Sequence, residues 1–248
     1  MAEQLWRRFR LSRPVASASI GQVYRARLVA GWQAGREGEE VAVKVQRPGA
    51  RREVEQDMRV LESLLGGLAP LRGVVETIGA TLSGELDYLL EARNAMDFAA
   101  VEREVPFVVV PRPVAPLTTS RVLTLEWVEG KTPGEVAAAG GPEASEQLSR
   151  LVAMTLQCTV TLLLRESMVH GDPHGGNLLL TPEGKLAYLD FGVLCRVERE
   201  QARALLLASV HVLNQQWREV INWPCPAPLP SLALPSPSDP TALFVASP

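Results

Sequence analysis

Three polar residues late in the chain have the types and the spacing that phosphoryl transfer requires. Asp172 is followed five positions later by Asn177, and Asp190 comes thirteen positions after that, at the start of Asp-Phe-Gly. One carboxylate can position an attacking hydroxyl or water, while an amide and a second carboxylate can hold metal on phosphate oxygens. Asp-Phe-Gly alone is a weak signal, but the Asp-x-x-x-x-Asn before it makes the pattern specific. The set predicts a phosphoryl-transfer site in which Asn177 and Asp190 ligate Mg²⁺.

A lysine in a β-rich run could supply the positive charge that such a site needs. Lys44 ends Val-Ala-Val-Lys, which is close to the Val-Ala-Ile-Lys of the third strand of protein kinases. A strand lysine beneath phosphates needs a helix carboxylate to orient it, and Glu85, Asp87 and Glu91 are the candidates. Taken by itself, Lys44 would be read as a solvent-exposed lysine at a strand edge.

Two further segments could contact a nucleotide. A run of small residues occupies the position of a kinase glycine-rich loop, and its candidate contacts are Ala16, Ser17, Ala18, Ser19, Ile20, Gly21 and Val23. Because alanine and serine restrict φ more than glycine does, this loop is expected to be stiff. Glu126 and Val128 follow a β-rich run where a kinase hinge would offer backbone groups to adenine. The alternative for the second segment is an ordinary strand end.

The segment around Asp172 also allows a metal-centre interpretation. His170, Asp172 and His174 alternate, so they could ligate Zn²⁺ or iron from one face of a strand. Pro173 and the two glycines that follow His174 make a regular strand unfavourable. We therefore expect His170 to brace the catalytic loop from within the core.

The elements that must position these residues follow from apolar periodicity and turn residues. Strands are predicted in 12–28, 40–46, 105–113, 121–127 and 186–189, and helices in 52–65, 77–103, 151–164 and 199–222. This order predicts an α+β, protein-kinase-like two-lobed fold. Residues 1–130 would form a β-rich N-lobe with long helices, and 131–222 an incomplete helical C-lobe. Residues 223–248 are proline-rich and are expected to be disordered or extended.

Composition limits the classes of function. The 248 residues are 46% apolar and 21% charged, as in a soluble globular protein. A formal charge of −3 argues against a nucleic-acid partner. Three scattered cysteines favour a reducing compartment. We expect no membrane span, because the best candidate, 151–164, is too short, and no clear targeting peptide, because the basic N-terminus lacks an apolar core.

Taken together, these segments resemble the UbiB family of atypical kinases, also called ADCK or aarF-domain kinases. The matching segments occur in order along the chain: 16–26, 41–49, 85–95, 125–130, 170–177 and 189–192. The alanine-rich loop and Val-Lys-Val-Gln-Arg-Pro-Gly point to this family rather than to ordinary protein kinases.

The resemblance implies binding of ATP or ADP with Mg²⁺. It makes Lys44 the phosphate lysine, Glu91 its helix partner and Asp172 the catalytic aspartate. Glu85 and Asp87 are similar to a Glu-x-Asp pair in the family's accessory apparatus. The implied activity is that of an ATPase or a small-molecule or lipid kinase in prenylquinone metabolism, such as that of ubiquinone or plastoquinone. Implied partners are lipids, pathway proteins and a membrane surface, in a mitochondrion, a plastid or the bacterial cytoplasm.

Three departures from the family pattern leave a second interpretation open. The family's Lys-x-Gly-Gln helix is absent, Gly175 stands where proline is usual, and the pattern fades near 217–221. The chain is therefore expected to be truncated at both ends. The alternatives to an active kinase or ATPase are a catalytically silent nucleotide-binding module or scaffold, and a non-functional fragment.

Overall fold

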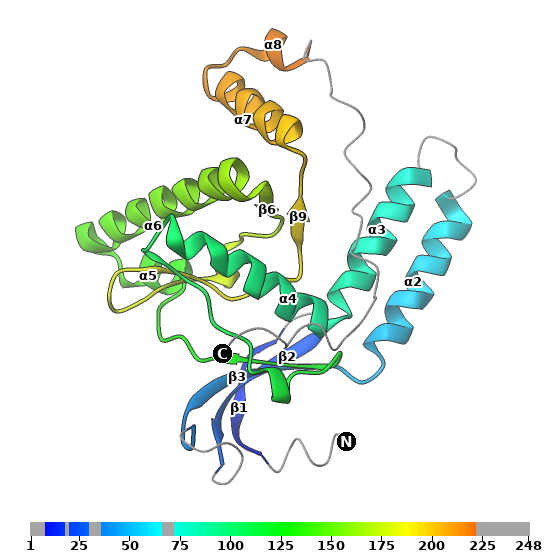
Figure 1. The fold of residues 1–248 in the computed structure, drawn as a ribbon, viewed down its shortest axis with the longest axis vertical. Helices are drawn as coiled ribbons and strands as arrows, with labels where there is room; N and C mark the ends of the chain where they lie inside the picture. The colour runs from blue at the N-terminus through cyan, green and yellow to red at the C-terminus, as the bar shows by residue number, and fades with distance from the viewer. Residues whose placement is uncertain (1–7, 18–19, 30–35, 66–71, 222–248) are drawn as a thin grey trace.

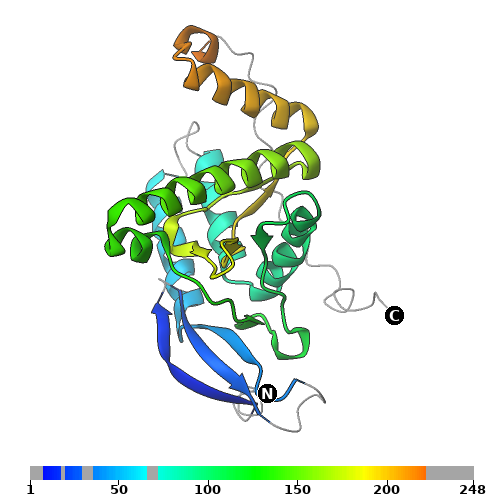
Figure 2. The same ribbon diagram turned by 90° about the vertical axis from the view of Figure 1, so that its left-hand side faces the viewer.

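The computed structural model of the protein describes residues 8–17, 20–29, 36–65 and 72–221. Figures 1 and 2 show an N-terminal sheet at one end, helices that rise from it, and a mainly helical second part. The expected α+β organisation in two lobes is confirmed. The predicted tail 223–248 lies outside the described residues, as do Ala18 and Ser19 of the predicted nucleotide loop.

The N-lobe sheet has four antiparallel strands in the order β1-β2-β3-β5. They are β1 Phe9–Ser17, β2 Gly21–Leu28, β3 Glu40–Gln46 and β5 Val122–Glu126. The register between β1 and β2 shifts on both sides of Pro14, which has no N–H to donate to a ladder. Val41 and Val43 are fully buried on one face of β3. Since side chains alternate along a strand, Lys44 leaves β3 on the other face.

Three helices connect β3 to the second lobe: α2 Ala50–Leu65, α3 Arg72–Glu85 and α4 Tyr88–Phe98, followed by the 3₁₀ turn η2 Ala99–Arg103. α2 and α3 pack side by side (Figure 1). The prediction of one helix over 77–103 is wrong, because the helix is interrupted between Glu85 and Tyr88. The Asp87 side chain accepts a hydrogen bond from the Leu89 N–H at 3.0 Å and so begins a new helix as its N-cap.

The second lobe combines helices with two small sheets, β4-β8-β7 and β6-β9. Its elements, with the short η3 that precedes β5, are β4 Val108–Val109, η3 Ala115–Leu117, α5 Pro133–Ala139, α6 Gly141–Thr161, η4 Leu162–Glu166, β6 Met168–His170, η5 Gly175–Asn177, β7 Leu178–Leu180, β8 Leu186–Tyr188, β9 Leu194–Arg196, α7 Arg199–Leu213 and α8 Trp217–Ile221. The predicted strand 105–113 is reduced to β4. The predicted helix 199–222 is two helices, separated near Gln215, whose φ is 58°.

The helix α6 is longer and less buried than expected. It starts at Gly141, and with η4 the helical run reaches Glu166, so it is long and apolar enough to cross a membrane by length and composition alone. The expectation that the apolar helix is too short to span a membrane is therefore wrong as to its length. A single helix of this kind is weak evidence of a membrane span. Leu151, Met154, Cys158 and Leu162 are buried in the lobe's core, whereas the opposite face is exposed. α6 is therefore a core helix with one apolar face uncovered.

α4 joins the two lobes. Its first half packs Tyr88 and Ala92 against Leu123 and Leu125 of β5. Its second half places Ala95 and Phe98 in the main core of the second lobe. A helix held at both ends in this way fixes the position of the residues between them, which include Glu91.

Candidate active site

Lys44 is the centre of a buried cluster of charges. Its Nζ lies 2.8 and 2.9 Å from the two carboxylate oxygens of Glu91 and 2.9 Å from Oδ2 of Asp190. The side chains of Lys44 and Glu91 are 15% and 3% exposed, and that of Asp190 is 35% exposed. Of the three carboxylates that the sequence left open as partners of Lys44, the structure selects Glu91. Residues 44, 91 and 190 are thus brought together from β3, α4 and the segment after β8.

The surroundings set the charge states in this cluster. Burial alone would lower the pKa of Lys44, but the carboxylates of Glu91 and Asp190 outweigh this cost and raise it. Burial would raise the pKa of Asp190, yet Lys44 and the Gly192 N–H, which donates to Oδ1 at 2.9 Å, hold it below its ordinary value. Lys44 is therefore a fixed positive charge, and Asp190 is an ionised carboxylate partly open to solvent.

α4 also holds the Asp-Phe-Gly segment. The Asn94 side-chain amide donates to the Phe191 carbonyl at 2.8 Å, one helical turn after Glu91. The Phe191 ring is fully buried and lies 5.4 Å from the Phe98 ring, centroid to centroid. Asn94 was not among the predicted site residues. Its spacing of three from Glu91, on one face of a predicted helix, is the signal that could have found it.

His170 braces the catalytic loop, as expected from the sequence. It is 7% exposed, and its Nε2 lies 2.7 Å from the Asp190 carbonyl oxygen, to which it donates. Its Nδ1 accepts the Asp172 N–H at 3.2 Å. One neutral ring thus ties the backbone of Asp172 to that of Asp190. Because both ring nitrogens are engaged, His170 has no lone pair for a metal, and the interpretation of this segment as a zinc or iron centre is wrong.

Asn177 and Asp190 offer the oxygen donors that Mg²⁺ prefers. The Asn177 Nδ2 donates to the Asp172 carbonyl at 3.2 Å, which leaves its Oδ1 for another partner. The Leu189 N–H donates to the Asn177 carbonyl at 2.9 Å and fixes the loop beside Asp190. Within the described part of the chain no group of three or more His, Cys, Asp or Glu side chains could hold a metal. The donor set therefore fits Mg²⁺ bound by few protein oxygens, with phosphates and water completing its shell.

The predicted nucleotide loop is the connection between β1 and β2. Ala16 and Ser17 end β1, Gly21 begins β2, and Val23 pairs directly with Lys44. A Cβ on Gly21 would overlap the hydroxyl of Tyr88 and lie 3.1 Å from the Val45 carbonyl oxygen. The Tyr88 hydroxyl is buried and has no hydrogen-bond partner in the described structure. The glycine is thus required by a close approach between loop and helix.

Gly21→Ala is expected to lower the free energy of unfolding by about 1–3 kcal/mol, because the added methyl overpacks this contact. Tyr88→Phe removes the overlapping hydroxyl, so the double variant should lose less stability than the two single changes added together. Urea unfolding of the four proteins measures the difference. Gly134→Ala, where the nearest atom would be 3.9 Å away, is the control. Additive losses would show that the two residues do not clash.

The predicted hinge links the lobes, and its two candidate residues, Glu126 and Val128, differ in their backbone hydrogen bonds. The Glu126 N–H donates to the Arg112 carbonyl at 3.0 Å, so this backbone donor is occupied. Val128 makes no backbone hydrogen bond to any part of the chain that the structure describes. A Cβ on Gly130 would meet the Leu180 carbonyl oxygen at 2.8 Å, so this glycine allows the segment to pass close to β7. Of the two candidates, Val128 is the one whose amide and carbonyl are left for a ligand.

The contribution of His170 to the stability of the metal-free protein should fall as the pH drops below about 6.5, the ordinary pKa of histidine. Burial lowers the pKa of His170 in the folded state. Below this pH the unfolded chain therefore binds a proton at His170 more readily than the folded chain does. The contribution of His170 to the free energy of unfolding then decreases by at most about 1.4 kcal/mol for each pH unit. Urea unfolding in EDTA between roughly pH 5 and 7 measures it. His170→Gln should remove this contribution, so that its stability falls less, or rises more, than that of the wild type as the pH drops, while exposed His174→Gln should behave like the wild type. Burial raises the pKa of Glu91 to about 7, and this opposite contribution is common to all three proteins. Equal pH dependence in all three proteins would contradict the role of His170.

The fold and the cluster define a class of protein. A four-stranded sheet carrying a buried lysine, a helix glutamate paired with it, and an Asp-Phe-Gly aspartate at the same lysine make a protein-kinase-like domain. Residues 1–223 match the family described as the ABC1 atypical kinase-like domain. The chain belongs to this family, and the predicted resemblance to the UbiB and aarF-domain kinases is confirmed.

Curated relatives agree with this assignment. An uncharacterized aarF domain-containing protein kinase of Arabidopsis thaliana, chloroplastic, is 37% identical over 212 residues, which cover 83% of this chain and 28% of the relative. ACTIVITY OF BC1 COMPLEX KINASE 1, also chloroplastic and from Arabidopsis thaliana, is 34% identical and is matched over 85% of this chain and 31% of its own length. The chain thus spans about three tenths of these relatives.

A solved structure shares the fold. The complex of Rv3197 with erythromycin from Mycobacterium tuberculosis has a TM-score of 0.65 to this protein and 31% sequence identity. The match covers 87% of this chain and 55% of that one. The expected protein-kinase-like fold is therefore confirmed.

Proposed function

We propose that the protein binds ATP or ADP with Mg²⁺ and transfers or releases the terminal phosphoryl group, as an atypical kinase or ATPase. The observation that supports this most strongly is the position of Lys44 Nζ, within 2.9 Å of both Glu91 and Asp190. In kinase-like sites such a lysine contacts the phosphates, the helix glutamate orients it, and the aspartate holds metal. Membership in the kinase-like family favours the same conclusion.

Each residue has a separate task in the proposed reaction. Lys44 contributes a fixed positive charge to the phosphates, and Glu91 keeps its side chain in place. Asn177 and Asp190 would hold Mg²⁺, which when bound neutralises charge on the phosphate oxygens. Asp172 carries an exposed carboxylate on a backbone fixed by His170, and it accepts the proton of the attacking hydroxyl or water. Val128 offers an amide and a carbonyl to the adenine edge.

The phosphoryl acceptor that we propose is a small molecule or lipid of prenylquinone metabolism, met at a membrane surface together with proteins of that pathway. Two considerations support it: the resemblance to UbiB kinases, and the chloroplast and bacterial sources of the curated relatives, some of which are named for an activity of a bc1 complex kinase. A plastid or a bacterial cell is accordingly the proposed location.

A silent nucleotide-binding module is the second candidate. One observation favours it: the charges of Lys44, Glu91 and Asp190 are already satisfied within the protein, as a scaffold also requires. In addition, two cavities of the described structure lie elsewhere, one at the end of β3 and one between α2 and α3. Neither cavity has Lys44, Glu91 or Asp190 in its lining.

Calorimetric titration of ADP tests the binding site. The wild type should bind ADP more tightly with Mg²⁺ than in EDTA, and Asp190→Asn should weaken the Mg²⁺-dependent affinity by about tenfold or more, or about 1.4 kcal/mol. Asp57→Asn, an exposed change on α2, is the matched control and should bind like the wild type. Equal affinity of the wild type and Asp190→Asn would remove the metal from the proposal.

A further inference from the structure

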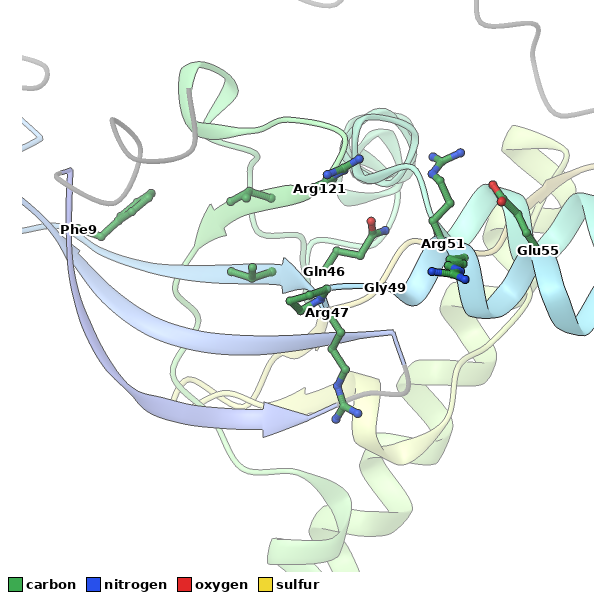
Figure 3. A pocket seen from close by; sticks show the side chains of 11 residues that line it. Phe9, Gln46, Arg47, Gly49, Arg51, Glu55 and Arg121 are labelled. Carbon is green, nitrogen blue, oxygen red and sulfur yellow. The ribbon is translucent and has the colours of Figure 1, made fainter.

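A basic site lies at the end of the N-lobe sheet, and its lining does not include Lys44, Glu91 or Asp190. A cavity of about 460 Å³ opens where β3 and β5 meet the first turn of α2 (Figure 3). Its charged lining consists of Arg47, Arg51, Arg52, Arg121 and Glu55. The lining thus carries a net charge of +3, in a chain whose formal charge is −3. The volume falls within the range of about 300–1,000 Å³ that small-molecule sites occupy.

The fold brings these arginines together from distant parts of the sequence. The Gln46 N–H donates to the Arg121 carbonyl at 3.0 Å, which places the start of β5 beside the end of β3. Gly49, with φ of 90°, then turns the chain into α2, so that Arg51 faces the same region. Figure 3 shows Arg51 and Arg121 on either side of Gln46. The fold thus places Arg51 and Arg121 in the lining of one cavity.

The described residues leave most of the positive charge at this cavity without an ionic partner. Among the residues that the structure describes, Arg51, Arg52 and Arg121 make no ion pair, although Glu55 lines the same cavity. Six arginines elsewhere are paired with carboxylates, Arg25, Arg27, Arg36, Arg112, Arg165 and Arg196, whereas others, such as Arg59 and Arg203, are single exposed charges that line no part of this cavity. Unpaired like charges around one hollow repel each other, and an anion bound between them would relieve that repulsion.

The cavity adjoins the predicted nucleotide loop, because the Arg47 N–H donates to the Ile20 carbonyl at 2.8 Å, but its lining does not include Lys44. Val45 lines it, and the preceding residue, Lys44, leaves the strand on the opposite face. Apart from Gln46 and Gly49, the uncharged lining is apolar and consists of Phe9, Val45, Pro48 and Val122. The site therefore combines guanidinium groups with apolar side chains, which suits an anion that carries an organic part.

We propose that this cavity binds a phosphate ester, with the phosphate held by Arg51 and Arg121 and the organic part resting on Phe9 and Val122. A guanidinium group matches two phosphate oxygens at once, and such charge-assisted hydrogen bonds are stronger than neutral ones. Arg47 is a lesser partner, because its guanidinium donates to Ser17 Oγ at 2.7 Å. The phosphate ester comes either from a free metabolite or from a lipid headgroup, and the two sources share this chemistry.

Two probes distinguish the sources. Glycerol 3-phosphate is titrated by calorimetry in EDTA, and vesicles of phosphatidylcholine with or without phosphatidylglycerol are tested by cosedimentation. The double variant Arg51→Gln/Arg121→Gln should weaken binding by about tenfold or more, because it removes both guanidinium groups. The control Arg59→Gln/Arg203→Gln removes two exposed arginines elsewhere and should change the affinity by less than about twofold.

Loss of glycerol 3-phosphate binding in the arginine variant supports a free phosphate ester. Loss of binding to phosphatidylglycerol vesicles alone supports a lipid headgroup. The proposal is overturned when neither probe binds the wild type, or when the arginine variant binds as well as the control. Melting by circular dichroism verifies folding, and the single variants Arg51→Gln and Arg121→Gln provide the same comparison should the double variant not fold.

Discussion

Asp172→Asn is expected to slow phosphate release from Mg²⁺-ATP by roughly 10²–10⁴-fold, the usual contribution of a positioned general base. Asparagine fills the same volume but cannot accept the proton of the attacking group. The backbone contacts of Asp172 with His170 and Asn177 do not involve the substituted carboxylate, so the loop should keep its shape. The affinity for Mg²⁺-ADP should stay within about twofold of the wild type, because Asp172 is not in contact with Lys44.

Single-turnover release of phosphate and calorimetric binding of ADP are measured on the same preparations. Asp57→Asn, the same substitution at an exposed helix position, should change neither quantity. Release that survives in Asp172→Asn would take this residue out of the reaction. A wild type that binds nucleotide and releases no phosphate would favour the silent module over the enzyme.

Glu91→Ala is expected to lower the free energy of unfolding by about 3–5 kcal/mol, as is usual when one partner of a buried ion pair is removed. Glu91 is 3% exposed, and both of its oxygens contact Lys44. The variant leaves a mostly buried ammonium with Asp190 as its remaining carboxylate partner in the described structure, together with a small cavity on α4. Urea unfolding measures the loss, and Glu146→Ala, an exposed change on α6, should cost less than about 0.5 kcal/mol.

Replacing both members of the pair separates stability from function. Lys44→Met/Glu91→Leu puts apolar side chains of similar size in the same place, and such exchanges are often neutral or stabilising. The double variant should therefore regain most of the stability that Glu91→Ala loses, and it should bind no Mg²⁺-ADP. A loss below about 1 kcal/mol in Glu91→Ala would mean that the pair is not a buried charge cluster.

Much of the candidate site could be predicted because its residues lie in short motifs whose spacing is fixed by chemistry. The sequence predicted Lys44 on a strand and Glu91 as one of three candidate carboxylates. It also predicted that Asp172, Asn177 and Asp190 belong to one phosphoryl-transfer site. The structure brings Lys44, Glu91 and Asp190 into contact, and it fixes Asp172 and Asn177 beside them. The roles of these residues stay predictions until they are measured.

What the sequence did not predict depends on tertiary contacts and on capping. The helix is interrupted before Tyr88 because the Asp87 side chain caps the start of α4 with one hydrogen bond. The helical spacing of apolar residues, on which the prediction of a single helix was based, gives no sign of this cap. No helix was predicted between 103 and 151, yet Thr132 and Glu135 form a capping box that starts α5. The close contact of Gly21 with Tyr88, 67 positions later, has no local signal at all.

The central claim is that Lys44, held by Glu91, binds the phosphates of a nucleotide whose Mg²⁺ is held by Asn177 and Asp190. Thermal unfolding of the wild type tests it most directly. Nucleotide that binds only the folded state adds about 2.7 kcal/mol of stability at a concentration of about 100 times Kd. For a chain of this size that is a rise in Tm of roughly 5–10 °C. The account predicts this rise for ATP and ADP with Mg²⁺, and a smaller one in EDTA. An unchanged Tm with both nucleotides would contradict it.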